Sequence, residues 1–288
     1  MHTKETGTRA LVLGGGSVAG VAWELGIITG LHEKNVDVRG ADIIIGTSAG
    51  AMVGAQIISG TDLESLFASQ LAPVEQLKER KGEFDPARLK EIFNRAVAEA
   101  GPDIKAIRTR IGAYALAAPT VPEAERRASI AARLPSHTWP KPRLLIVAVD
   151  TATGEEYIMD RESGVSLVDA VAASCAVPGI RPPVTIAGRR YMDGGMRSTT
   201  NADLAKGYDH VLILNPLGAN EDWMSIIEEA EALEREGSRV LVIEPDAASV
   251  TAIGLNPMDL ATRQPSALAG RAQGRELADS VAALWSQS

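Results

Sequence analysis

The chain has 288 residues, of which 45% are hydrophobic and 23% charged, and its formal net charge is −8. This length and composition indicate a globular protein that can bury a sizeable core. The acidic charge excludes nucleic acid as a main partner, because phosphate binding needs a basic surface. Contact with a lipid surface stays open, since apolar side chains can hold a protein at an interface without a positive field.

The sequence has one cysteine, Cys175, so it can form no intramolecular disulfide. Residues 1–9 are polar and lack the tripartite pattern of a secretion signal. No apolar run approaches the 18 residues or so that a membrane-spanning helix needs. These features predict a cytoplasmic protein for which peripheral membrane contact stays open, and they leave the oligomeric state unknown.

After the polar residues 1–9, the chain has an apolar run, then glycines, and then a helical pattern that reaches about residue 33. Similar alternation along the chain predicts an α/β fold with a largely parallel central sheet flanked by helices. The aliphatic runs are nearly continuous, as in strands that are buried on both faces. We expect these strands at 10–13, 42–45, 144–149, 211–214 and 239–243.

Residues of about 61–140 are rich in charged residues and alanine, with apolar positions at helical spacing and several prolines. This stretch predicts a helical insertion that covers the sheet edge. A last Ala-rich helix is expected over about 266–286. No linker interrupts the pattern, so we expect 1–288 to form a single domain.

Gly46-Thr47-Ser48-Ala49-Gly50 matches G-x-S-x-G between a predicted strand and a predicted helix. A serine on such a sharp turn needs small residues two positions before and after it, since larger side chains would collide. The context favours Ser48 as a nucleophile above the strand end. The other interpretation is a glycine-rich turn in which Ser48 only caps the helix.

Gly14, Gly15 and Gly16 follow the first strand and precede a helix. Tandem glycines expose backbone N–H groups that can converge on the oxyanion of an acyl-transfer reaction. The same segment, with Ala19 and a later acid at Asp37, also fits a loose dinucleotide-binding fingerprint. The turn at Ser48 favours acyl transfer, because a dinucleotide site does not need it.

A serine nucleophile needs a base, and two residues are candidates. His210 directly precedes the strand expected at 211–214. It would therefore lie at the amino end of that strand, whereas active sites in parallel sheets lie at the carboxyl ends. Asp193, followed by Gly194 and Gly195, is the better candidate, although a turn residue would show the same pattern.

Together these segments resemble the patatin-like phospholipases. The resemblance is carried by the glycine loop, the Ser48 turn, an Ala173–Gly179 segment similar to the family's A-S-x-A-x-P pattern, and Asp193-Gly194-Gly195. It covers about residues 8–216. It implies a patatin-like three-layer sandwich and a Ser–Asp dyad of Ser48 and Asp193. It also implies that backbone amides of Gly14, Gly15, Gly16 and Ser17 bind the oxyanion. Val18-Ala19 stands where many members have Arg-Gly, a departure that bears more on the phospholipase label than on the esterase label.

We therefore expect a serine hydrolase that cleaves lipid or other carboxylic acyl esters through an acyl-enzyme, with no cofactor and no metal. A noncatalytic lipid-binding relative and a dinucleotide-binding oxidoreductase are the alternatives. The acyl chain is expected between the carboxyl edge of the sheet and the helical insertion. Candidate lining residues are Leu63, Leu66, Phe67, Ile111, Tyr114 and Leu116.

Overall fold

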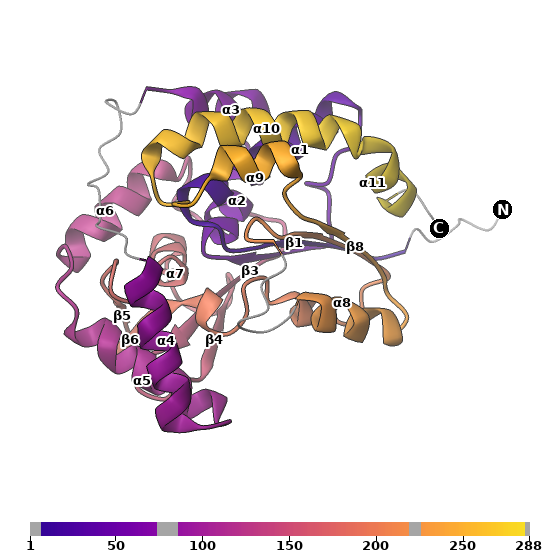
Figure 1. Ribbon diagram of the computed structural model, residues 1–288. Helices are drawn as coiled ribbons and strands as arrows, with labels where there is room; N and C mark the ends of the chain where they lie inside the picture. Colours follow the sequence, from indigo (N-terminus) through magenta and orange to yellow (C-terminus); the bar gives the residue numbers. More distant parts are fainter. Residues whose placement is uncertain (1–6, 74–85, 219–225, 286–288) are drawn as a thin grey trace.

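A computed structural model of the chain describes residues 7–73, 86–218 and 226–285, with only the backbone described for 86–90. Its centre is a sheet with the strand order β5-β6-β3-β2-β1-β7-β8, and β4 also pairs with β3 (Figure 1). Five strands run parallel, which confirms the predicted fold class. They are β1 (Arg9–Leu13), β2 (Ile43–Thr47), β3 (Leu144–Asp150), β7 (His210–Leu214) and β8 (Arg239–Ile243).

The strands at one side of the sheet are antiparallel. They are β4 (Glu156–Met159), β5 (Val184–Ile186) and β6 (Arg189–Asp193). None of these three strands was expected from the sequence. All are short and carry exposed or half-exposed residues, so none shows the continuous aliphatic run that marks a strand buried on both faces. β6 carries Asp193 at its last position.

The strands bury side chains on both faces, so the fold has three layers. Residues such as Leu11, Leu13 and Ile44 join a core beneath one set of helices. Their neighbours Val12 and Ile45 face the opposite way, as the two-residue period of a strand requires. The first face is covered by α1 (Ser17–Glu33), α2 (Ala49–Ile57), α7 (Leu167–Ser174) and α11 (Ala278–Trp285). The second face is covered by the short helix Ala202–Ala205 and by α8 (Ile226–Arg235).

Helix α1 crosses α10 (Arg263–Glu276) at very close range (Figure 1). A Cβ atom on Gly26 would lie 2.4 Å from the Ala267 carbonyl oxygen, and one on Gly270 would lie 2.4 Å from the Trp23 oxygen. Two glycines spaced four apart on each helix therefore let the backbones touch. This contact holds α1 in place, and α1 begins directly after the glycine loop.

Four helices occupy the described parts of residues 61–140: α3 (Leu63–Leu71), α4 (Pro86–Ala100), α5 (Ile104–Ala117) and α6 (Glu123–Arg133). The C-terminal part forms α10 and α11 instead of one helix, and residue 286 lies outside the described residues. The chain bends at Leu277, because α10 packs along α1 whereas α11 packs on β7 and β8. A further helix, α9 (Ala247–Ile253), packs on α10.

Candidate active site

Ser48 lies in a sharp turn between the end of β2 and the start of α2. Its φ is 52°, a value that a residue with a side chain adopts only under strain. A Cβ on Gly46 would lie 2.6 Å from the Gly50 oxygen, and one on Gly50 would lie 2.0 Å from the Leu13 oxygen. Both glycines are therefore required by close backbone contacts, and the turn places Ser48 at the carboxyl end of the sheet.

Asp193 contacts Ser48 directly. The Ser48 hydroxyl donates a hydrogen bond of 2.7 Å to Oδ2 of Asp193, and the Gly195 amide donates one of 2.8 Å to Oδ1. The carboxylate is 3% exposed. Burial raises the pKa of Asp193 to about 7, although the Ser48 hydroxyl, the Gly195 amide and the Arg126 charge each lower it. A carboxylate with this pKa can exchange a proton with the serine near neutral pH.

The segment after α7 holds both members of this pair. The Ser174 hydroxyl accepts a 2.9 Å hydrogen bond from the Ser48 amide, and the Cys175 thiol donates one of 3.0 Å to the Ser48 carbonyl. The Ala176 carbonyl accepts a 3.0 Å bond from the Asp193 amide. The sequence showed this motif only as part of a family resemblance. Its positioning role, in which consecutive residues fix Ser48 and then Asp193, was not predicted.

The buried side-chain amide of Asn201 supports the loop that follows Asp193. Asn201 has a left-handed backbone and is fully buried. Its side-chain Nδ2 donates 2.8 Å bonds to the Thr47 hydroxyl and to the Ser198 carbonyl. This links the residue before the serine to the loop after the aspartate. Sequence reasoning missed Asn201, because a single asparagine in a turn carries no distinguishing signal.

The glycine loop lies against Ser48, since a Cβ on Gly15 would lie 3.7 Å from the Ser48 Cβ. Two of the four amides expected to bind an oxyanion already have partners. The Gly14 amide donates to the Leu214 carbonyl at 3.0 Å, and the Gly15 amide donates to the Thr199 carbonyl at 2.7 Å. Among the described residues, the amides of Gly16 and Ser17 have no acceptor. They lie at the start of α1, where the helix dipole also favours a negative charge.

Glu24 is a fully buried acid in α1. Burial raises its pKa well above the usual range, and the nearby Gly14 amide offsets this only in part. Neither carboxyl oxygen has a hydrogen-bond partner in the described chain. Burial therefore favours the protonated, neutral form of Glu24.

Two other sequence candidates lie away from Ser48. His210 is the first residue of β7, at the amino end of the sheet, as the sequence predicted. Asp37 precedes β2, and its carboxylate is held by Arg39 through two hydrogen bonds of 2.8 Å. A dinucleotide-binding acid would lie beyond the carboxyl end of β2, so Asp37 cannot serve the glycine loop in that way.

The residues proposed to line an acyl groove do not converge. Leu63 and Leu66 belong to the main core, and Phe67 packs between α1 and α10, with the Arg271 guanidinium 4.6 Å from its ring centre. Ile111 is buried in a separate cluster on the other face of the sheet, and Leu116 is 46% exposed. Tyr114 lies near the loop after the Ala173–Gly179 segment, where a Cβ on Gly179 would meet its hydroxyl at 2.6 Å. Of the six, only Tyr114 is thus tied to a segment that positions Ser48.

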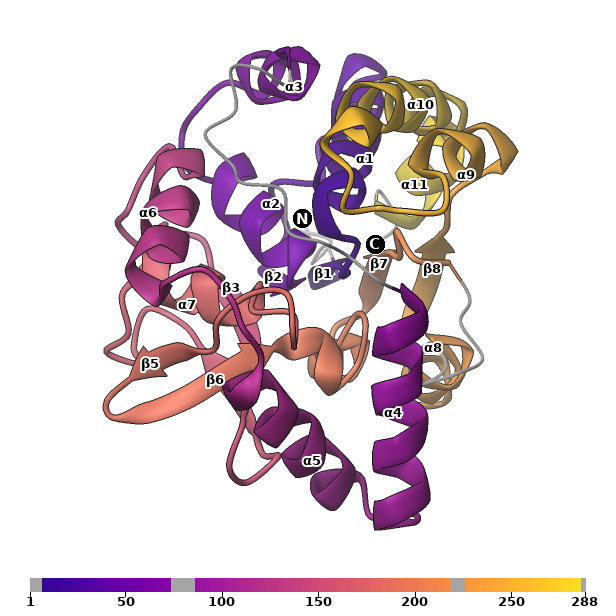
Figure 2. The same cartoon turned by 60° about the vertical axis from the view of Figure 1, so that its left-hand side comes forward.

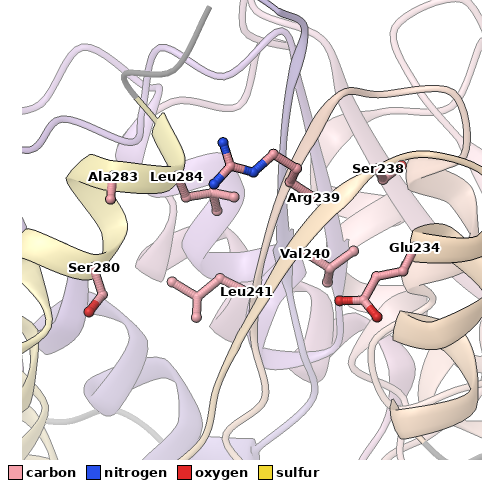
Figure 3. A pocket seen from close by; sticks show the side chains of 8 residues that line it. All are labelled: Glu234, Ser238, Arg239, Val240, Leu241, Ser280, Ala283 and Leu284. Carbon is pink, nitrogen blue, oxygen red and sulfur yellow. The ribbon is translucent and has the colours of Figure 1, made fainter.

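A cavity of about 460 Å³ lies elsewhere, between β8, α8 and α11. Figure 3 shows Val240 and Leu241 of β8 in its centre, with Glu234 on one side and Ser280 on the other. Its β8 residues belong to the half of the strand that pairs with the start of β7, so it lies at the end of the sheet opposite Ser48. It forms no part of the Ser48 site.

In residues 7–73, 86–218 and 226–285, no group of three or more His, Cys, Asp or Glu residues is placed to hold a metal ion. No helix in those ranges is both long and apolar enough to cross a membrane.

Residues 11–206 match a protein-family model described as patatin-like phospholipase. Similar solved structures include VipD from Legionella pneumophila, at 14% identity and a TM-score of 0.47, which aligns with 96% of this chain and 67% of that protein. The type III effector ExoU aligns at 15% identity and a TM-score of 0.43, over 96% of this chain and 53% of ExoU. ExoU from Pseudomonas aeruginosa in complex with SpcU gives 16% identity and a TM-score of 0.36. This chain thus spans about half the length of ExoU.

Proposed function

The chain belongs to the patatin-like phospholipase family, which makes it a lipid acyl hydrolase, and on that premise we propose that it cleaves carboxylic esters through Ser48 and Asp193. The observation that carries the proposal is the 2.7 Å hydrogen bond from the Ser48 hydroxyl to the buried Asp193 carboxylate. A nucleophile and its base within hydrogen-bond reach, on a strained turn at the carboxyl end of a sheet, is the arrangement that acyl transfer requires.

The first half of the reaction forms an acyl-enzyme. Oδ2 of Asp193 takes the proton of the Ser48 hydroxyl as Oγ bonds to the ester carbonyl carbon, and the carbonyl oxygen becomes an oxyanion. The tetrahedral intermediate then collapses and the bond to the alcohol oxygen breaks. The leaving alkoxide takes the proton from Asp193, so an alcohol or a lysolipid departs.

The second half reverses the roles with water. Asp193 takes a proton from water, whose oxygen attacks the acyl carbon of Ser48. Collapse of the second tetrahedral intermediate breaks the bond to Oγ, which recovers the proton, and the fatty acid leaves. One carboxylate can serve both halves because its pKa of about 7 lies near the working pH.

We assign the oxyanion site to the amides of Gly16 and Ser17. These amides have no acceptor in the described chain, and their loop lies beside Ser48. The amides of Gly14 and Gly15 instead hold the loop to β7 and to Thr199. The predicted set of four donors therefore divides into two that shape the loop and two that can bind the substrate.

Hydrolysis of a soluble ester tests the assignment. The wild-type chain, Ser48→Ala and Asp193→Asn would be assayed with p-nitrophenyl butyrate, with circular dichroism to confirm folding. We expect each variant to lose at least about 10³-fold in kcat/KM, as is typical when a nucleophile or its base is removed. A folded Ser48→Ala protein that retains activity would overturn the proposal.

A further inference from the structure

Beyond catalysis, one apolar side chain among the described residues is left entirely uncovered by the fold. Leu255 is 99% exposed, and Val250, five positions earlier in α9, is 59% exposed. Single exposed leucines are common on protein surfaces. Complete exposure at the tip of a well-held loop beside a lipid hydrolase site is a different situation, because the side chain projects away from every part of the protein.

The backbone of this tip is held firmly. Gly254 ends α9 with a φ of 65° and donates to the Val250 carbonyl at 3.0 Å. The Met258 amide donates to the Asn256 side chain at 3.1 Å, and the Asp259 amide donates to the Asn256 carbonyl at 3.0 Å. The turn that carries Leu255 is therefore already ordered. Inserting the Leu255 side chain into a lipid layer then costs little backbone conformational entropy.

The tip adjoins the proposed oxyanion site. The Pro257 carbonyl accepts a 2.9 Å hydrogen bond from the Ala19 amide, two residues after Ser17. A second exposed leucine, Leu217, is 41% exposed and follows Pro216, whose ring would meet a Cβ placed on Gly16 at 2.6 Å. Two separate segments thus bring exposed apolar side chains to the border of the glycine loop. In Figure 2 the connection from α9 to α10 passes close to α1.

The charge pattern indicates what covers the tip. Residues 247–258 contain no charged side chain, in a chain that is 23% charged overall. Without basic residues, the tip lacks the cations that bind anionic lipid headgroups. Without acidic residues, it also avoids placing a charge in the apolar layer of a membrane. An uncharged apolar tip fits the interface of zwitterionic lipid.

We propose that Leu255, together with the exposed Val250 of α9, inserts into a zwitterionic lipid surface and holds the Ser48 site against it. The inference rests on the proposed function, because the lipid surface is where a lipid acyl hydrolase finds its substrate. It adds the segment that makes the contact and the kind of lipid that receives it.

Co-sedimentation with phosphatidylcholine vesicles tests the inference. Every protein carries Ser48→Ala, so that binding is measured without turnover and does not depend on the proposed catalysis. Full burial of a leucine side chain favours partitioning by more than tenfold, so we expect Leu255→Ser to weaken vesicle binding by about tenfold. Leu255→Phe keeps a large apolar side chain and should bind the vesicles as the parent protein does.

Ile104→Ser is the matched control. Ile104 is 45% exposed at the start of α5, which lies on a different side of the molecule from α9 in both views (Figures 1 and 2). It should bind vesicles as the parent protein does, and all variants should keep the parent melting temperature.

Four results would overturn the inference. One is a parent protein that does not bind the vesicles. A second is equal binding by Leu255→Ser, and a third is an equal loss of binding by Ile104→Ser. The fourth is a concentration-dependent dimer in sedimentation that Leu255→Ser abolishes, because the tip would then contact a second copy of the chain.

Discussion

The ionisation of Asp193 gives a quantitative prediction about stability. Its pKa is about 7 in the folded protein, against an ordinary value of 3.8. Between those values the folded protein retains a proton that the unfolded chain has released. The free energy of unfolding therefore falls as the pH rises through this window. Each pH unit corresponds to about 1.36 kcal/mol, so ionising Asp193 lowers the stability by up to about 4 kcal/mol.

Asp193→Asn removes this penalty while keeping the local contacts. The asparagine Oδ1 can accept from the Gly195 amide, and its Nδ2 can donate to the Ser48 oxygen, so neither neighbour loses its partner. We expect the variant to be more stable than wild type by about 2–4 kcal/mol at pH 8.5, with the advantage shrinking as the pH falls toward 4. The variant should be inactive across this range.

Urea unfolding at pH 4.5, 5.5, 6.5, 7.5 and 8.5 would measure the difference between the two proteins. Glu24 also titrates with a raised pKa, but it is present in both proteins and cancels in the difference. Parallel stability curves over the whole range would refute the reasoning, since Asp193 would then have an ordinary pKa in the folded state.

The remaining predictions concern the glycines and the histidine. Gly26→Ala should lower the free energy of unfolding by about 2 kcal/mol, because its Cβ would meet the Ala267 carbonyl at 2.4 Å. Gly40→Ala is the control, since its Cβ would lie in open space, and it should leave the stability unchanged in the same urea experiment. Gly16→Ala should lower kcat by about 10²–10³-fold with little change in KM, because displacing one oxyanion donor weakens binding only in the transition state; an unchanged kcat would exclude Gly16 from that role. His210→Ala should keep kcat within about twofold, and complete loss in a folded protein would require a histidine base.

Four of the parallel strands, β1, β2, β3 and β7, could be predicted because their side chains are buried on both faces, which leaves nearly continuous aliphatic runs. The edge strand β8 is only partly buried but carries a similar aliphatic run. β6 escaped prediction because it begins with two arginines, of which Arg189 is exposed and Arg190 is half-buried. Yet β6 determines where the proposed base lies, because its pairing with β3 places Asp193 opposite Ala148. A sequence can suggest an acid of the right type, but the pairing that brings it to Ser48 lies in long-range backbone contacts.

The glycine loop shows a second limit of sequence reasoning. Four consecutive amides looked equivalent in the pattern from Gly14 to Ser17. The tertiary structure distinguishes them, because the carbonyls of Leu214 and Thr199 accept from the first two. Those acceptors come from segments about 185–200 positions away, so no local pattern could identify which donors stay available.

If Asp193 activates Ser48, a fluorophosphonate should label that serine, and the intact mass of the protein after incubation with the probe would show it. We expect one covalent adduct on the wild-type chain, mapped by peptide analysis to Ser48, absent from Ser48→Ala and formed much more slowly on Asp193→Asn. An adduct on another residue, or none on a folded wild-type protein, would rule out Ser48 as the activated nucleophile.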